Sequence, residues 1–304
     1  MIVLLALLAG LTGTTPDPVL VTGRVVRVVD GDTLAVGGAS VVLHGVGPER
    51  QGPLDSLPSS ATGAFRFRVT PDSGTILLVS ARWAGIEYFA PPLTGSSDVT
   101  VVVVDTSSTQ AVEFAARHLI IAGPAPDGAR DVVDLFILAN RGERTRVAPD
   151  SLTATWRMPL PPHIANVTVG DADFSPEAFD VHGDTLLLHA AIPPGERQFF
   201  LSYQLAPGAR TLDVPLGPLP DTMSILTEER DLRITGGPQP VGEEEVAGRV
   251  FQRSTGGGER LAARVVVTLA GRTAAPGWTL YLLLGGLLVG LALATRRALL
   301  PRRS

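Results

Sequence analysis

Hydrophobic and polar residues alternate most strictly between residues 63 and 69. Phe65 and Phe67 fall on one face of an extended chain there, and Arg66 and Arg68 fall on the other. Other short apolar runs, separated by Gly, Pro, Asp and Ser, occupy residues 21–29, 39–44, 75–83 and 99–104. No stretch of this region has a helical period. The pattern over residues 19–105 therefore predicts a β-sandwich of about seven strands, with a loop at residues 45–60.

After a linker at residues 106–110, the β pattern resumes and predicts a second, larger sandwich over residues 111–272. Its expected strands are residues 112–121, 132–139, 152–158, 185–190, 198–205 and 211–214. The sequence PPGE at residues 193–196, before FFLSY at residues 199–203, is common in bacterial immunoglobulin-like domains, and the second sandwich resembles these domains. We also expect a hairpin of residues 246–253 and 261–269, which either completes this sandwich or forms a separate piece above a membrane. The predicted fold class is all-β, with two tandem sandwiches.

A third pattern, near the C-terminus, is apolar on every face. Residues 278–295 read WTLYLLLGGLLVGLALAT and carry no charge. A helix of this length extends about 27 Å, enough to cross the hydrocarbon core of a bilayer. We therefore predict a transmembrane helix. Gly286, Gly290 and Ala294 recur every four residues, so they would form one small-residue face suited to helix packing in lipid.

The two ends of the chain predict its orientation. Residues 2–11 form a ten-residue apolar run, the length of a signal-peptide core, and we assign residues 1–15 to a signal peptide. The arginine-rich tail at residues 296–304 follows the predicted span directly, as expected for a cytoplasmic flank. The sequence thus predicts a single-pass protein of a bacterial inner membrane. Most of the chain would be periplasmic, with the C-terminus in the cytoplasm.

The amino-acid composition excludes several kinds of chemistry. The chain has no cysteine and no lysine, so its Lys+Arg total of 25 consists of arginine alone. Disulfides, thiolate metal sites, Schiff-base chemistry and lysine-dependent phosphate loops are therefore excluded. Four arginines follow the predicted span, so the residues before it hold 21 arginines against 30 acidic residues, a formal charge of −9. A region of that charge has no electrostatic basis for binding nucleic acid.

Several segments of the first domain resemble a known family. The matching sequences are Gly23-Arg24-Val25-Val26, GASVVL at residues 38–43, TGAFRF at residues 62–67, and the strand at residues 76–81. Together they resemble the carboxypeptidase regulatory-like (transthyretin-like) domain. The resemblance implies a non-catalytic accessory module, and its wider fold group includes carbohydrate-binding modules. It covers less than a third of the chain.

Aromatic residues near residue 85 are the only binding candidates in the first domain. Trp83 shares its predicted face with Leu77 and Val79, which places it in the core. Tyr88 and Phe89 point to opposite faces, so at most one of them can lie outside and contact a glycan.

Searches for catalytic or metal-binding patterns give no candidate. The sequence has no H-E-x-x-H or G-x-S-x-G motif, and none of its five histidines has a glutamate three residues later. The acidic segment at residues 171–184 departs from a calcium loop at Pro176 and His182, so we interpret it as a solvated loop. His182 and His189 are interpreted as a turn residue and a strand end.

We therefore expect no enzyme activity, cofactor or metal. The predicted function is binding or scaffolding at the cell envelope, with a protein partner and contact with the membrane through one helix. A carbohydrate-binding protein is the alternative, and an accessory subunit of an envelope enzyme is the third interpretation.

Overall fold

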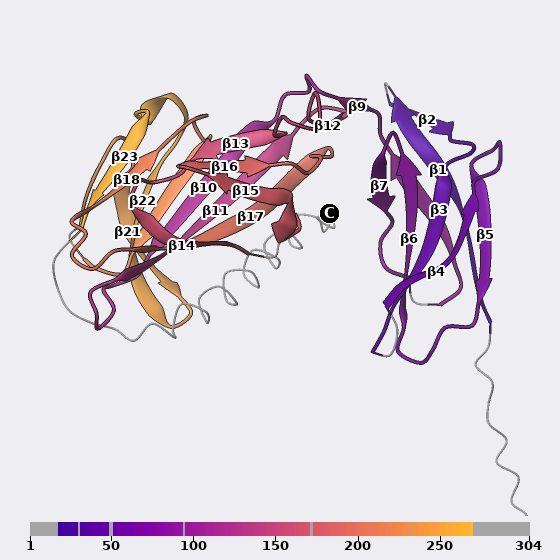
Figure 1. Cartoon of the computed structure of the whole chain (residues 1–304), viewed down its shortest axis with the longest axis horizontal. Coiled ribbons are helices and arrows are strands. Elements are labelled where there is room, and N and C mark those ends of the chain that lie inside the picture. Colours follow the sequence, from indigo (N-terminus) through magenta and orange to yellow (C-terminus); the bar gives the residue numbers. More distant parts are fainter. Residues whose placement is uncertain are drawn as a thin grey trace, which may run out of the picture. The chain divides into compact units, whose positions relative to one another are not determined.

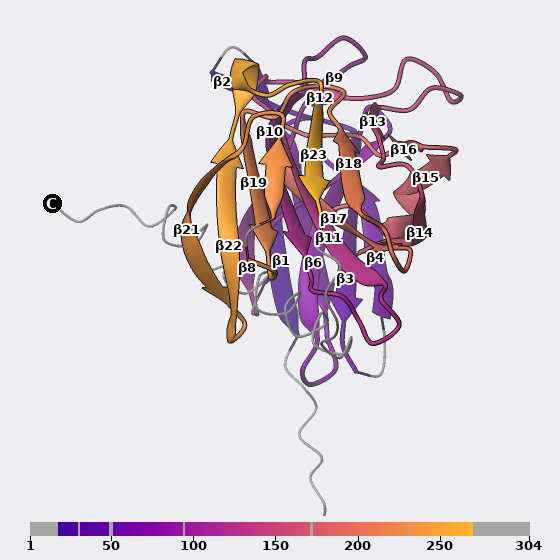
Figure 2. The same cartoon turned by 90° about the vertical axis from the view of Figure 1, so that its left-hand side faces the viewer.

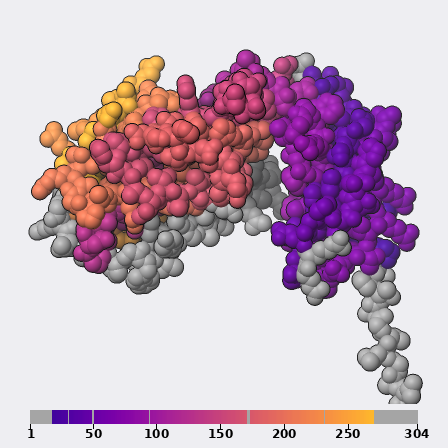
Figure 3. Space-filling view, viewed as in Figure 1, coloured from indigo at the N-terminus to yellow at the C-terminus, as the bar shows by residue number. Residues whose placement is uncertain are grey.

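The computed structural model describes residues 18–269, except positions 30, 49–50, 94, 171–172 and 231. Within this part the chain is almost entirely β-structure, as the sequence predicts, and it divides into two compact units between Thr106 and Ser107 (Figure 1). Side chains close the spaces between the strands of each unit (Figure 3). No helix among the described residues is long and apolar enough to cross a bilayer. The predicted signal peptide, transmembrane helix with its small-residue face, and arginine-rich tail lie outside the described residues.

The first unit consists of two four-stranded sheets. Its strands are β1 (Val19–Val29), β2 (Asp32–Ala35), β3 (Ser40–Val46), β4 (Gln51–Pro58), β5 (Ala64–Val69), β6 (Ile76–Trp83), β7 (Ile86–Phe89) and β8 (Ser97–Val103). In the first sheet, β1 pairs with β5 along its first half, with β2 along its second half, and in parallel with β8. The second sheet has the order β4-β3-β6-β7 (Figure 1).

The alternation predicted at residues 63–69 is confirmed in β5. Phe65 and Phe67 are buried in the core shared by the two sheets, whereas Arg66 and Arg68 are exposed. Gly63, just before this strand, has a φ of +76°, and a Cβ atom there would lie 2.4 Å from the carbonyl oxygen of Val25. Glycine is therefore needed at this turn for both its backbone conformation and its lack of a side chain.

The predicted loop at residues 45–60 is wrong. β3 continues to Val46, and β4 at Gln51–Pro58 pairs with it antiparallel, with a register shift between Leu43 and His44. β4 is an edge strand, and an edge strand tolerates proline because one side of its backbone needs no partner. Leu54 and Leu57 pack partly against the core and supply the apolar contacts of a strand that otherwise has a loop-like composition.

The second unit is larger and holds fifteen strands among the described residues. They are β9 (Thr106–Ser107), β10 (Glu113–Ile121), β11 (Arg130–Asn140), β12 (Thr145–Arg146), β13 (Trp156–Pro159), β14 (Ile164–Val169), β15 (Phe179–His182), β16 (Thr185–Leu188), β17 (Gly195–Leu205), β18 (Thr211–Pro215), β19 (Thr222–Thr227), β20 (Arg233–Thr235), β21 (Gln239–Val246), β22 (Arg249–Gly256) and β23 (Arg264–Thr268). Two short 3₁₀ turns, η1 (Pro176–Ala178) and η2 (Gly258–Arg260), interrupt them.

One long sheet organises this unit. Its order is β14-β17-β11-β10-β19-β22-β21, and Figure 2 shows its β21 end at the left. Two three-stranded sheets, β13-β16-β15 and β18-β23-β20, share one hydrophobic core with its inner face. β9 and β12 form a separate two-stranded pair. The arrangement has two layers, as expected when each sheet must bury one apolar face.

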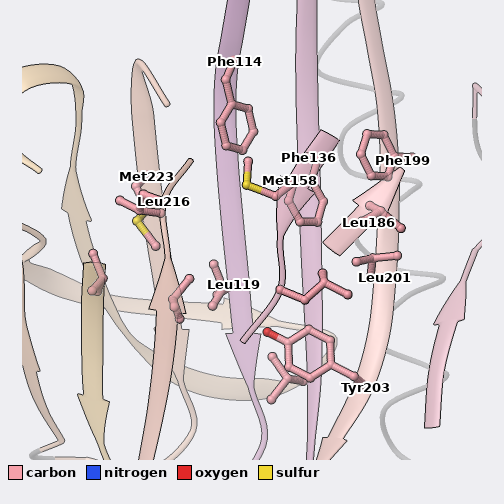
Figure 4. Packing of buried hydrophobic residues seen from close by; sticks show 14 of the residues in the cluster. Phe114, Leu119, Phe136, Met158, Leu186, Phe199, Leu201, Tyr203, Leu216 and Met223 are labelled. Carbon is pink, nitrogen blue, oxygen red and sulfur yellow. The ribbon is translucent and has the colours of Figure 1, made fainter. Parts of the chain in front are cut away.

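Aromatic rings fill the centre of that core. Phe136 of β11 and Phe199 of β17 stack with centroids 4.9 Å apart (Figure 4). Trp156 of β13 meets both rings edge-on. Met158 and Leu186 from the small sheet pack into the same cluster. Alternating burial along β17, where Phe199 and Leu201 are fully buried, follows from the two-residue period of a strand.

Two expectations for this region need correction. The hairpin predicted from residues 246–253 and 261–269 does not form, because β22 pairs with β19 and β21 whereas β23 pairs with β18 and β20. Residues 239–268 therefore belong to the sheets of the second unit. The strand predicted from residue 152 begins only at Trp156, since Asp150 accepts hydrogen bonds from the amides of Leu152 and Thr153 and forms a turn. In addition, β14, β15, β19, β20 and β21 are strands at positions where the sequence pattern predicts none.

Candidate binding sites

The first candidate site is the outer face of the sheet β4-β3-β6-β7. Leu77, Val79 and Ala81 of β6 point into the core, so the alternate residues of β6 and of its neighbours point outward. We call the part of this surface formed by β3, β6 and β7 the Phe89 face; it consists of Ser40, Val42, His44, Val46, Ile76, Leu78, Ser80, Arg82, Glu87 and Phe89. Phe89 is 57% exposed and Ile76 is 48% exposed, so the face presents apolar groups to solvent.

The structure separates the two aromatic candidates of β7. Tyr88 is 9% exposed, and its hydroxyl donates a hydrogen bond of 3.0 Å to the carbonyl oxygen of Val104. Phe89 lies on the opposite face of the strand, outside the core. Trp83 packs against the core, as its position in the pattern predicts, and its Nε1 donates to Oδ1 of Asp105 at 3.2 Å. Of these three side chains, Phe89 is therefore the one available to a ligand.

A hydrogen-bonded trio supports the Phe89 ring. The hydroxyl of Ser80 donates to Oε1 of Glu87 at 2.6 Å, and Nε2 of His44 lies 2.8 Å from the same hydroxyl oxygen. Because the single hydroxyl proton of Ser80 goes to Glu87, Nε2 of His44 must carry a proton and donate it. The ring of His44 is thereby held with its centroid 5.6 Å from that of Phe89.

This trio contains the residue types of a hydrolase triad but not its geometry. A nucleophilic serine must be reachable and must give its proton to the histidine, whereas Ser80 is fully buried and gives its proton to the carboxylate. We conclude that the trio orders the surface around Phe89 and does not perform acyl transfer.

The described acidic side chains of residues 173–180 form hydrogen bonds and an ion contact within the second unit. Asp173 accepts a hydrogen bond of 2.7 Å from the amide of Gln198, Asp180 lies 3.4 Å from Nε2 of His189, and Glu177 accepts one from Ser175. His182 ends β15 beside a turn. In the described part of the chain no three His, Asp or Glu side chains converge in a way that could hold a metal ion.

The second candidate site is a cavity of about 860 Å³ in the second unit, which the sequence did not reveal. Alternate residues of β13 and β16 (Arg157, Pro159, Thr185 and Leu187) line one side of it. The remaining wall consists of Val112, Arg146 of β12, the segment Leu152–Trp156, and Gly217 with Pro218. Its two charged side chains are both arginines, and they come from different strands. Nothing in the local pattern around either arginine indicated that they would meet.

Comparison with known proteins assigns no family. No protein-family model matches this sequence, and no curated protein matches it. Among solved structures, native leukotriene A4 hydrolase from Saccharomyces cerevisiae is 9% identical with a TM-score of 0.33, covering 54% of this chain and 30% of its own. An M1 zinc metallopeptidase from Deinococcus radiodurans is 11% identical with a TM-score of 0.30, covering 56% and 45% respectively. This chain thus spans less than half the length of these proteins, and similarities of this size carry no argument about its activity.

Proposed function

We propose that this protein is a non-catalytic, membrane-anchored binding or scaffold protein of the cell envelope. In this proposal residues 1–15 direct export, residues 278–295 anchor the chain, and both β units are extracytoplasmic. The first unit is a carboxypeptidase regulatory-like (transthyretin-like) module, and the second is an immunoglobulin-like sandwich. The charge difference between the two sides of the predicted span supports this orientation.

The proposed binding function rests on the Phe89 face. It combines exposed apolar groups, Phe89 and Ile76, with the polar groups of His44 and Glu87. Protein interfaces commonly have an aromatic or aliphatic centre and a polar rim. The face lies on hydrogen-bonded strands of one sheet, so a partner would meet it without the first unit having to reorganise. We therefore propose an extracytoplasmic protein as the partner.

A glycan is the second candidate, and the exposure of Phe89 is what favours it. Sugar rings stack on flat aromatic faces, and Phe89 offers one. Tyr88 and Trp83 do not extend that face, since both are engaged with the core. A single exposed ring beside His44 and Ser80 fits a protein contact better than an extended sugar platform. Service as an accessory subunit of an envelope enzyme is the third proposal, and it would use the same face.

Site-specific photo-crosslinking in living cells tests the proposal. A photoreactive phenylalanine analogue replaces Phe89 in one variant and Ile76 in a second. A third variant carries it at Val102, which is 47% exposed on the other sheet of the same unit. We expect discrete protein adducts from the first two variants and none from the third. Equal adducts from all three, or none from any, would contradict the proposed face, and adducts sensitive to glycosidase would favour the glycan.

A further inference from the structure

We propose that the cavity of the second unit binds a small organic anion through Arg146 and Arg157. The inference is independent of the Phe89 face, because every residue involved belongs to the second unit. A volume of about 860 Å³ is within the range of small-molecule sites.

The charged side chains of the cavity indicate the sign of the charge on the ligand. Arg146 and Arg157 line it, and no Asp or Glu does. Among the described residues neither arginine forms an ion pair, although ten such pairs occur elsewhere in that part of the chain, such as Arg117 with Asp134. Two unpaired guanidinium groups at one concavity create a positive potential that attracts carboxylate or phosphate groups.

Arg146 is held in place with part of its donor capacity unused. Its Nη1 donates a hydrogen bond of 3.1 Å to the carbonyl oxygen of Gln110, and its backbone is fixed by exchange of hydrogen bonds with Ile192. Its Nε is buried and has no partner in the described part of the chain. A guanidinium that is fixed at one nitrogen loses little further freedom when it binds an anion at another.

Thr155 provides a second unsatisfied group at the same wall. This residue is 5% exposed, and its Oγ1 is buried without a hydrogen-bond partner among the described residues. An unpaired buried hydroxyl is costly, and no hydrogen bond opposes its rotation toward the cavity. A ligand oxygen reached by that rotation would satisfy it.

The remaining lining indicates that the anion carries an apolar body. Leu187, Pro159 and Val112 line the cavity with the arginines, and Leu152 at its rim is 92% exposed. These groups would contact hydrocarbon and not a bare ion. Either a carboxylate or a phosphate could supply the charge, because the guanidinium fork binds both.

Isothermal titration calorimetry of the full chain in lipid nanodiscs tests this inference, with empty discs as the reference. The probes are 4-phenylbutyrate, its neutral amide 4-phenylbutyramide, phenyl phosphate and inorganic phosphate. We expect saturable binding of phenylbutyrate or phenyl phosphate, and the stronger of the two identifies the acid group. The neutral amide and inorganic phosphate should each bind at least about tenfold more weakly, since each lacks one of the two features.

Three variants locate the site. Arg146→Gln and Arg157→Gln should each weaken binding of the stronger probe about tenfold, whereas Arg66→Gln, an exposed arginine of the first unit, should leave it unchanged. Thr155→Val should weaken binding and leave the melting temperature unchanged or higher, because it removes an unpaired buried hydroxyl. This last variant separates a loss of the ligand site from a loss of folding.

Three outcomes would overturn the inference. They are the absence of saturation by either organic anion up to about 20 mM, equally strong binding of the neutral amide or of inorganic phosphate, and unchanged binding in Arg146→Gln and Arg157→Gln. None of these outcomes depends on the Phe89 face.

Discussion

Arg117 and Asp134 form a bidentate ion pair inside the core of the second unit. Nε of Arg117 lies 3.0 Å from Oδ1 of Asp134, Nη2 lies 2.6 Å from Oδ2, and both side chains are fully buried. Nη1 of Arg117 also donates to the carbonyl oxygen of Pro215 at 3.0 Å, which ties the long sheet to β18. Burial raises the pKa of the Asp134 carboxyl, while the charge of Arg117 and its hydrogen bonds act in the opposite direction.

The first prediction follows from this pair. Asp134→Leu leaves a buried guanidinium without its counter-charge, and we expect the free energy of unfolding to fall by about 3–5 kcal/mol. The double variant Arg117→Met with Asp134→Leu removes both charges and should recover most of that loss. Denaturant unfolding of the purified variants measures both values. If the double variant were as unstable as Asp134→Leu, the loss of stability would not come from the uncompensated charge of Arg117.

The second prediction concerns the glycines of the first unit. Gly63 and Gly38 have nearly equal φ angles of +76° and +75°, but only at Gly63 would a Cβ atom approach the backbone, at 2.4 Å from the oxygen of Val25. Gly63→Ala should therefore destabilise the protein by about 2 kcal/mol more than Gly38→Ala, because both carry the same dihedral strain and only one adds a clash. Thermal unfolding compares the two, and equal losses would contradict the steric explanation.

The third prediction distinguishes Tyr88 from Phe89 by stability. Tyr88→Ala empties a core position and removes a hydrogen bond to Val104, and should cost about 3 kcal/mol or more. Phe89→Ala truncates an exposed side chain and should cost less than about 1 kcal/mol. Both values come from denaturant unfolding. A large loss for Phe89→Ala would mean that the ring supports the fold and is not held available for a partner.

The fourth prediction concerns pH and His118 of β10. Burial, and to a smaller extent the charge of Arg253, lower the pKa of His118 below its ordinary value of 6.5, and Glu244 partly opposes this. A lowered histidine pKa means that below about pH 6.5 the unfolded chain binds a proton that the folded chain does not, so folding weakens as the pH falls. His118→Gln should show a shallower loss of melting temperature than the parent between about pH 7 and pH 5. Parallel curves would exclude His118 as the cause.

The fifth prediction is topological and rests on the proposed orientation. Protease added to the periplasmic side of intact inner membranes should digest residues 19–277, whereas a tag placed after Ser304 should remain protected. Immunoblots against the tag and against the first unit provide the measurement. Digestion of the tag would show that the orientation is the opposite of the proposed one, and it would contradict the proposal of an extracytoplasmic partner.

Some features of this protein are determined by the sequence alone. The alternation at residues 63–69 fixes which side chains share a face, because successive residues of a strand point to opposite sides wherever that strand lies. The same rule places Tyr88 and Phe89 on opposite faces of their strand before any partner strand is known. The all-β fold class follows from the repetition of such runs between turn residues.

Other features were decided only by tertiary structure. Which of Tyr88 and Phe89 enters the core depends on the side from which the other sheet packs, and period alone does not contain that information. β4 and β21 are strands because a neighbouring strand satisfies their backbone, although their proline, glycine and glutamate residues favour loops. The pairing of Arg117 with Asp134, and the meeting of Arg146 with Arg157 at one cavity, likewise join separate strands. Contacts of this kind depend on register and sheet order, which are set by the packing of the whole unit and not by any local pattern.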